Sequence, residues 1–340
     1  MLLGITAGDS SGVGPEILLK AFGKNEIRHP VVVFGDYEIL DYFNGFLGYG
    51  VPLRKISTPS EHQDGLLNVI DAEIMRREDL SIGKLSAKSG RAAREYAIAA
   101  TRSALSGDIA AMVTLPMNKE ATQLSDPGFV GHTELIGSLC GVKDVTIMLV
   151  SDQLIVTHVS THVSLATAIE RTKKERICKI IQLTTDAVSK LRSNPRIAVA
   201  GLNPHAGENG LFGDQEIKEI RPAVDWAQSQ GMPVEGPFPP DTVFYMTVRK
   251  KRFDAIVCMY HDQGHIPLKL LDFEGGVNVA LGLPIVRTSV DHGTAFDIAG
   301  QGVASTESLI HALELAAKLA NPGQNQAPNK VNTIHTQRPK

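Results

Sequence analysis

The sequence has few of the features that mark secreted, nucleic-acid-binding or membrane proteins. Its 340 residues include only three cysteines, Cys140, Cys178 and Cys258, which are too scattered for a disulfide framework or a cysteine zinc site. Its 34 basic residues nearly balance its 37 acidic ones, and no basic run favours a nucleic-acid partner. No apolar stretch approaches the ~20 residues of a membrane span. No basic, apolar leader opens the sequence, so we expect a cytoplasmic protein.

Several common cofactor and metal motifs are missing too. The sequence has no GxGxxG loop, no GxxxxGK[ST] loop and no HExxH helix. The nearest substitute is "GDSSGVGPE" (8–16), which lies between a predicted strand and a helix that Pro15 can start. Its backbone amides could meet an anion, or the segment could be only a tight turn, and spacing alone favours neither.

Short apolar runs alternate with helical patterns along the chain. Apolar residues make up 43% of the sequence, which is enough for a large core. The alternation predicts an α/β protein with a largely parallel sheet. Helices are expected over 165–188 and 305–320. Strands are expected over 2–7, 31–35, 109–116, 145–151, 154–160, 196–203 and 253–260, and over 277–290 as one strand or two, because Pro284 interrupts it.

Histidines cluster where predicted strands end. At that edge of an open parallel sheet ligands commonly bind. A single histidine is more often structural than a ligand, but a convergence of His162, His205 and His261 would suit a divalent cation. The other clustered histidines are His132, His158, His265 and His292.

Four charged residues near these clusters are further candidates. Asp241 and Asp262 can orient ligand histidines, although each could equally cap a helix or turn. Lys269 and Arg287 can bind an anionic substrate, or be solvated surface charges. Arg287 lies in the otherwise apolar "LGLPIVRTSV", where a charge needs a partner.

Long motifs in the sequence resemble one enzyme family. The segments "GHTE", "STHVSL", "GLNPHAGENGLFG", "GPFPPDT", "MYHDQGHIPLK" and "GVNVALGLPIVRTSVDHGTAFDIAG" resemble the 4-hydroxythreonine-4-phosphate dehydrogenase family over about residues 1–320. The resemblance implies an isocitrate/isopropylmalate dehydrogenase-like fold, with two α/β domains, an active-site cleft between them, and a homodimer. Loop composition places one domain at 1–128 plus 299–322 and the other, with metal and dimer contacts, at 129–298. The polar tail 323–340 is expected to be disordered.

The resemblance also implies roles for individual residues. His162, His205 and His261 match the divalent-metal ligands, one of which comes from the partner subunit. Lys269, Asp241 and Asp262 are the catalytic candidates, for proton transfer and for orienting the ligands. The substrate positions are His132, Thr133, Lys269, Asn278 and Arg287, and the cofactor positions are Asn278, Leu281, Gly282, Pro284, Asp291, His292, Gly293 and Thr294.

The implied reaction is a metal- and NAD(P)-dependent oxidation, with decarboxylation, of a 4-phosphorylated 3-hydroxy acid. "HVSTHVSL" and "HDQGHIPLK" resemble the branch that oxidises 4-phospho-D-threonate or 4-phospho-D-erythronate more than the branch that uses 4-phosphohydroxy-L-threonine. A related branch oxidises a cis-dihydrodiol dicarboxylate. The histidines alone also permit a non-redox metal-dependent hydrolase or lyase, and a silent ligand-binding protein is a further rival. NAD or NADP, and Zn or Mg, Mn or Co, remain open.

Overall fold

One twelve-stranded sheet runs through the molecule, in the order β3-β4-β2-β1-β5-β12-β11-β6-β7-β10-β8-β9. The computed structural model describes residues 1–321, so the expected disordered tail lies outside the described residues. The strands are β1 (Leu3–Thr6), β2 (Val31–Gly35), β3 (Leu53–Ile56), β4 (Leu67–Asp71), β5 (Ala111–Thr114), β6 (Thr146–Val150), β7 (Ile155–His158), β8 (Ile197–Ala200), β9 (Val234–Phe238), β10 (Ala255–Cys258), β11 (Val277–Leu281) and β12 (Arg287–Val290).

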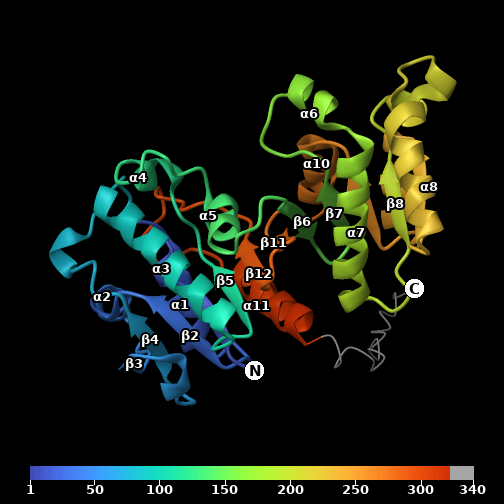
Figure 1. Cartoon of the computed structure of the whole chain (residues 1–340). Helices are drawn as coiled ribbons and strands as arrows, with labels where there is room; N and C mark the ends of the chain where they lie inside the picture. Colours follow the sequence, from blue (N-terminus) through green and yellow to red (C-terminus); the bar gives the residue numbers. More distant parts are fainter. Residues whose placement is uncertain (322–340) are drawn as a thin grey trace, which may run out of the picture.

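Helices cover both faces of this sheet, and the chain forms two lobes joined near β11 and β12 (Figure 1). None of the helices in the described part of the chain is long and apolar enough to cross a membrane. The α-helices are α1 (Gly14–Gly23), α2 (Tyr37–Leu47), α3 (Ala87–Ser106), α4 (Lys119–Gln123), α5 (His132–Leu139), α6 (Leu165–Arg171), α7 (Lys174–Leu191), α8 (Arg221–Ser229), α9 (Pro240–Val248), α10 (His261–Leu271) and α11 (Glu307–Ala320); the short turns η3 (Pro204–Gly210) and η4 (Glu216–Ile220) precede α8.

Every strand expected from the sequence is present, and the open question over 277–290 is settled as two strands. β11 runs antiparallel to both β12 and β6, and β6 runs antiparallel to β7, so the sheet is parallel except at these three pairings. The single helix expected over 165–188 is instead α6 and α7, because Thr172 and Lys173 leave the helical conformation. β3, β4 and β9 were not expected; β3 and β9 carry polar or partly exposed residues that hide the apolar pattern.

The first lobe contains the N-terminal strands and also the end of the described chain. β12 pairs in parallel with β5, and α11 packs into the same apolar core as α1, with Leu313 and Leu18 both fully buried. The second lobe has separate cores on the two faces of its sheet. Because the sheet continues from one lobe into the other, no gap between strands marks a boundary, and the expected domain limits stay a prediction.

Candidate active site

Two of the three predicted metal ligands lie side by side in the second lobe. His162 follows β7, and His261 is the first residue of α10, which follows the neighbouring parallel strand β10. Their ring centroids are 5.5 Å apart, and both line a depression in the surface. Burial, and then the nearby His261, lower the pKa of His162, which keeps its imidazole neutral and able to bind a cation.

His158 and His265, whose roles the sequence left open, are buried and pack against this pair. The ring of His265 stacks on that of His261 at 3.5 Å, and its Nδ1 lies 3.2 Å from Nε2 of the fully buried His158. Burial lowers the pKa of His158 to about 3 and that of His265 to about 4, so both rings are neutral. Gly264 makes the approach possible, because a Cβ there would lie 2.5 Å from Nε2 of His158.

Carboxylates orient two of the predicted ligands. Nδ1 of His261 is 2.6 Å from Oδ1 of Asp262, and Nδ1 of His205 is 2.8 Å from Oε2 of Glu208. In both rings this leaves Nε2 available, as is usual in histidines that bind metals. Asp241 does not orient a ring directly: the Glu208 hydrogen bond is the main cause that raises the pKa of His205, and Asp241 adds a smaller effect.

The three predicted metal ligands are not gathered at one place within residues 1–321. Among residues 1–321, no three His, Cys, Asp or Glu side chains are grouped so that they could hold a cation. His205 lies on η3 with its side chain 62% exposed, apart from the His162–His261 pair. The two adjacent imidazoles, with a carboxylate behind one of them, are a donor set that suits a divalent cation such as zinc, with at least one further ligand still needed.

The predicted substrate residues Asn278 and Arg287 share one face of the sheet. Asn278 pairs with Ser289 across β11 and β12, and Arg287 is two residues from Ser289, so all three point to the same side. The hydroxyl of Thr288 reaches α11 on the opposite side. Arg287 is 3% exposed and donates from Nη2 to Oγ1 of Thr114 at 2.6 Å. Its Nε and Asn278 Oδ1 are buried with no hydrogen-bond partner in the described chain.

Helix α5 brings further polar groups to this face. Burial, and then Arg287, lower the pKa of His132 to about 3. Burial lowers the pKa of Arg287 to about 10 against the opposing effect of Glu134, and Glu134 also acts on His162. Glu134 therefore lies within electrostatic reach of both the arginine and the imidazole pair. The sequence analysis overlooked it, although it stands beside His132 and Thr133 in "GHTE"; Thr133 is partly exposed on the same helix.

Lys269 and Asp291 form an ion pair that the sequence did not predict. Nζ of Lys269 is 2.7 Å from Oδ2 of Asp291, and it also lies 5.1 Å from the centre of the Phe273 ring. Lys269 is a predicted substrate and catalytic residue, and Asp291 is a predicted cofactor residue. The pair therefore links the two predicted regions.

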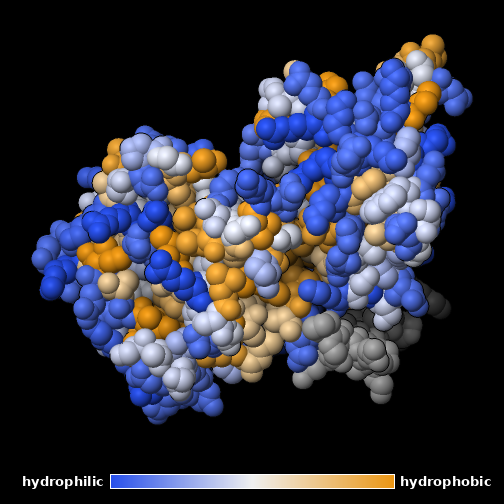
Figure 2. Space-filling model, in the orientation of Figure 1, coloured by the Kyte–Doolittle hydropathy of each residue, from blue (hydrophilic) through white to orange (hydrophobic). Residues whose placement is uncertain are grey.

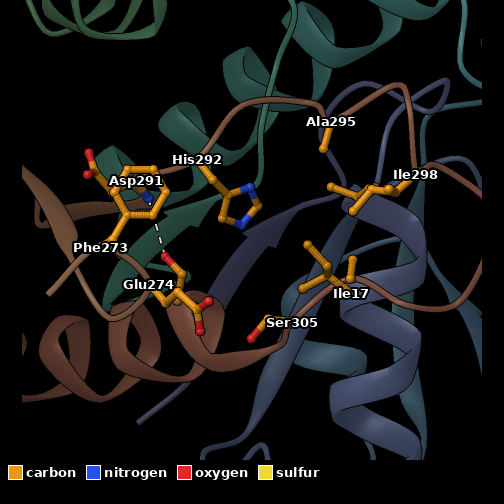
Figure 3. Close-up of a pocket in the computed structure, with 11 residues that line it drawn as sticks. Ile17, Phe273, Glu274, Asp291, His292, Ala295, Ile298 and Ser305 are labelled. Carbon is orange, nitrogen blue, oxygen red and sulfur yellow. Dashed lines mark hydrogen bonds between the residues drawn. The ribbon is translucent and has the colours of Figure 1, made fainter. Parts of the chain in front are cut away.

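Asp291 and His292 line a cavity of about 190 Å³ between the loop that follows β12 and the start of α1. In Figure 3, Ile17 and Ile298 point toward each other on one side, Phe273 and Glu274 lie on the other, and His292 stands between. The "GDSSGVGPE" loop forms part of this wall through Val13, whose N–H donates to the Thr294 carbonyl at 3.0 Å.

The predicted cofactor residues fall into two separate groups. Gly293 and Thr294 continue the loop beside the cavity, whereas Leu281, Gly282 and Pro284 lie at the opposite end of β11, where Leu281 pairs with the first residue of β6. Leu281 and Gly282 line a different cavity, which is bordered by α7 and α11. The structure therefore does not bring the two groups together, and only the group after β12 borders the 190 Å³ cavity.

Residues 26–316 match the family described as "Pyridoxal phosphate biosynthetic protein PdxA". The chain belongs to this family. It is 44% identical to a D-threonate 4-phosphate dehydrogenase from Salmonella typhimurium, over 93% of this chain and 98% of that protein. It is 43% identical to a 4-hydroxythreonine-4-phosphate dehydrogenase from Beijerinckia indica, over 94% of this chain and 95% of that protein.

Solved structures agree with this membership. A 4-hydroxythreonine-4-phosphate dehydrogenase from Klebsiella pneumoniae superposes with a TM-score of 0.85 at 42% identity, covering 94% of this chain and 99% of that one. A beta-decarboxylating dehydrogenase from Thermococcus kodakarensis, 13% identical with a TM-score of 0.51, shares the fold alone. The predicted family, the α/β dehydrogenase fold and the oxidoreductase class are confirmed. A dehydrogenase needs a hydride acceptor, and for this PdxA family member the nicotinamide cofactors are the expected class.

Proposed function

We propose that this PdxA family member oxidises D-threonate 4-phosphate, or a closely similar 4-phosphorylated 3-hydroxy acid, with NAD or NADP as hydride acceptor. The His162–His261 pair, with Asp262 fixing one ring, carries the proposal, because it offers two adjacent imidazoles to a divalent cation. 4-Phospho-D-erythronate and 4-phosphohydroxy-L-threonine are the alternative substrates. The names of the relatives support this substrate class.

The proposed reaction has two steps. In the first, the C3 carbon passes a hydride to the nicotinamide ring and the C3 hydroxyl loses its proton, which leaves a 3-keto acid. In the second, the bond from C2 to the carboxylate carbon breaks, CO2 leaves, and C2 takes up a proton. A bound divalent cation supplies Lewis acidity toward the hydroxyl and carbonyl oxygens in such chemistry.

The chain's own residues would bind the substrate and handle its protons. Arg287, buried with a free Nε, can hold an anionic group that replaces its missing partner. Asn278 can accept from a substrate hydroxyl through its unpartnered Oδ1. Lys269, whose Nζ lies 2.7 Å from Oδ2 of Asp291, can donate the proton that C2 takes up.

A second copy of the chain would supply the third imidazole. The segment around His205 exposes Leu211, Phe212 and Ile217, and the Phe212 ring is 5.8 Å from His205. Figure 2 shows hydrophobic side chains at the upper tip of this lobe, where they are exposed to solvent in the single chain. Exposed apolar groups gathered around one imidazole favour a covering protein surface. We therefore assign His205 to the His162–His261 pair of a partner subunit.

The test is a comparison of the three phosphorylated acids with each cofactor, in the presence of a divalent cation. We expect reduction of the nicotinamide cofactor with D-threonate 4-phosphate, release of one CO2 per turnover, and loss of both on chelation. If none of the acids reduces either cofactor while the metal-loaded protein is folded, the proposed function is wrong. A cation-dependent hydrolysis without cofactor reduction would favour the hydrolase alternative.

A further inference from the structure

Residues 300–304 have no regular secondary structure and lead to the wall of the 190 Å³ cavity, which we call the cofactor cavity and which Ala304 lines. Ile298, just before this segment, and Ala304 and Ser305, at its end, line the cavity together with Val13 and Ile17 from the start of α1. Figure 3 shows Ile298, Ser305 and Ile17 around it. A segment with neither helix nor strand must satisfy its buried backbone groups in another way.

Two side chains of α1 provide those partners. Glu16 is fully buried, and its Oε2 accepts from the N–H groups of Gly300 at 2.8 Å and Gly302 at 3.3 Å, while Oε1 accepts from that of Ala304 at 3.1 Å. One helical turn later, Nζ of Lys20 donates to the carbonyls of Gly302 at 3.1 Å and Ala304 at 2.8 Å. Five backbone groups of one irregular segment are thus bound by two residues.

The same helix also lines the cavity. Ile17 follows Glu16 directly and lies on the same side of the cavity as Ile298. The tether from Glu16 and Lys20 therefore fixes Ala304, which also lines the cavity, relative to Ile17. A carboxylate that accepts three buried N–H groups resists displacement, because any shift leaves at least one of those groups unsatisfied.

We propose that Glu16 and Lys20 are positioning residues that set the shape of this cavity, and hence the affinity for the dinucleotide, without touching it. Val13, Ile17, Ile298 and Ala304 give the cavity apolar walls, which fit the flat, weakly polar base of a dinucleotide. This inference rests on the proposed function, which places a nicotinamide cofactor here. Fixing these wall residues in the free protein lowers the ordering cost of binding.

The test uses Glu16→Gln and Lys20→Met in the full-length protein. Glu16→Gln turns an amide N–H₂ toward backbone N–H donors, so the segment must move. We expect the Kd for NAD or NADP, whichever the wild type binds, to rise about tenfold by calorimetry, against about threefold for Lys20→Met. The KM for the cofactor should rise in parallel, with kcat at saturating cofactor and the Kd of the phosphorylated substrate within about twofold of wild type.

Glu216→Gln is the matched control, because Glu216 is equally buried and accepts backbone N–H groups in the other lobe. It should leave cofactor affinity unchanged.

If the wild type binds neither NAD nor NADP, the proposed function fails. If it does bind and both α1 variants bind equally well, only this inference fails. An equal loss of cofactor affinity, substrate affinity and melting temperature would mark the pair as merely structural and overturn it. Should Glu16→Gln not fold, Lys20→Met decides alone.

Discussion

A buried glutamate in each lobe holds an irregular loop by its backbone amides. Glu16 binds residues 300–304 beside the proposed cofactor cavity, and Glu216 binds the loop after β8 through the N–H groups of Leu202 and Asn203, both at 2.7 Å. The first loop is bound through both kinds of backbone group, because Glu16 accepts from its N–H groups and Lys20 donates to its carbonyls. It leads to the 190 Å³ cavity, which Ala304 and Ser305 line.

In the second loop, Glu216 holds the residues nearest β8. Beyond Asn203 it enters η3, where His205, Ala206, Glu208 and Asn209 have positive φ angles of 53°, 52°, 41° and 55°. Such left-handed conformations are unfavourable for residues other than glycine and persist where the surroundings or a function maintain them. The difference is that residues 300–304 are bound at both N–H and carbonyl groups, whereas the His205 loop contains left-handed residues and, in the function proposed above, meets a partner subunit.

The largest expected effect is the loss of turnover when a proposed metal ligand is removed. His261→Ala removes an imidazole that the Asp262 carboxylate orients, and we expect turnover to fall by more than about a hundredfold. The melting temperature of the metal-free protein should change little, and His62→Ala, in the first lobe, is the control. Near-normal turnover in His261→Ala would remove the metal model.

Next in size is the effect of the buried guanidinium. Arg287→Met keeps much of the side-chain volume but removes the charge, and we expect kcat/KM for the phosphorylated acid to fall about 10- to 100-fold. The Kd for the cofactor should stay unchanged, because Arg287 does not line the cofactor cavity. Steady-state kinetics together with calorimetry check this. An unchanged kcat/KM would remove Arg287 from the substrate site.

Glu216→Gln sharpens the comparison from the other side. Loosening the loop that carries His205 should weaken divalent-cation affinity about tenfold, as losses of groups behind metal ligands commonly do. Cofactor affinity should not change, which is the reverse of the pattern for Glu16→Gln. Zinc titration with a competing chelator measures the first quantity. If both glutamate variants altered both affinities equally, the two lobes would not be specialised as described.

The smallest effect concerns packing beneath the imidazoles. A methyl group at position 264 would press on His158, Cys258 and Val156, so Gly264→Ala should cost about 1–3 kcal/mol of unfolding free energy. Gly45→Ala is the matched helical control in the first lobe, where no atom lies within 4 Å of the added Cβ, and it should stabilise by ~0.5–1 kcal/mol. Urea denaturation distinguishes the two; equal effects would contradict the close packing at Gly264.

The sequence predicted the strand ends and the adjacent imidazoles better than it predicted the groups that hold them. His162 and His261 follow neighbouring parallel strands, so strand order alone brings them close. His205 follows β8, also next to β10, yet η3 carries it away from the pair, and no pattern in the sequence indicates that turn.

The tethers were not predictable in this way. Glu16 binds residues 284 to 288 positions later, and Lys269 pairs with Asp291 across the junction of the lobes, so neither contact has a local signature. Long-range contacts of this kind depend on how the elements pack, which spacing along the chain does not encode. The same limit explains why Leu281, Gly282 and Pro284 were grouped with Asp291 although they lie at the other end of β11.

The most direct test of a metal centre shared between two subunits is complementation between inactive variants. His205→Ala and His261→Ala are co-expressed with different affinity tags, and the mixed dimer is purified through both tags. One of its two sites would lack both ligands and the other would lack neither, so we predict about half of the wild-type activity. A mixed dimer of His162→Ala and His261→Ala should stay inactive, because these two ligands belong to the same chain. Failure to recover any doubly tagged dimer, or a His205→Ala/His261→Ala dimer without activity, would contradict the shared centre.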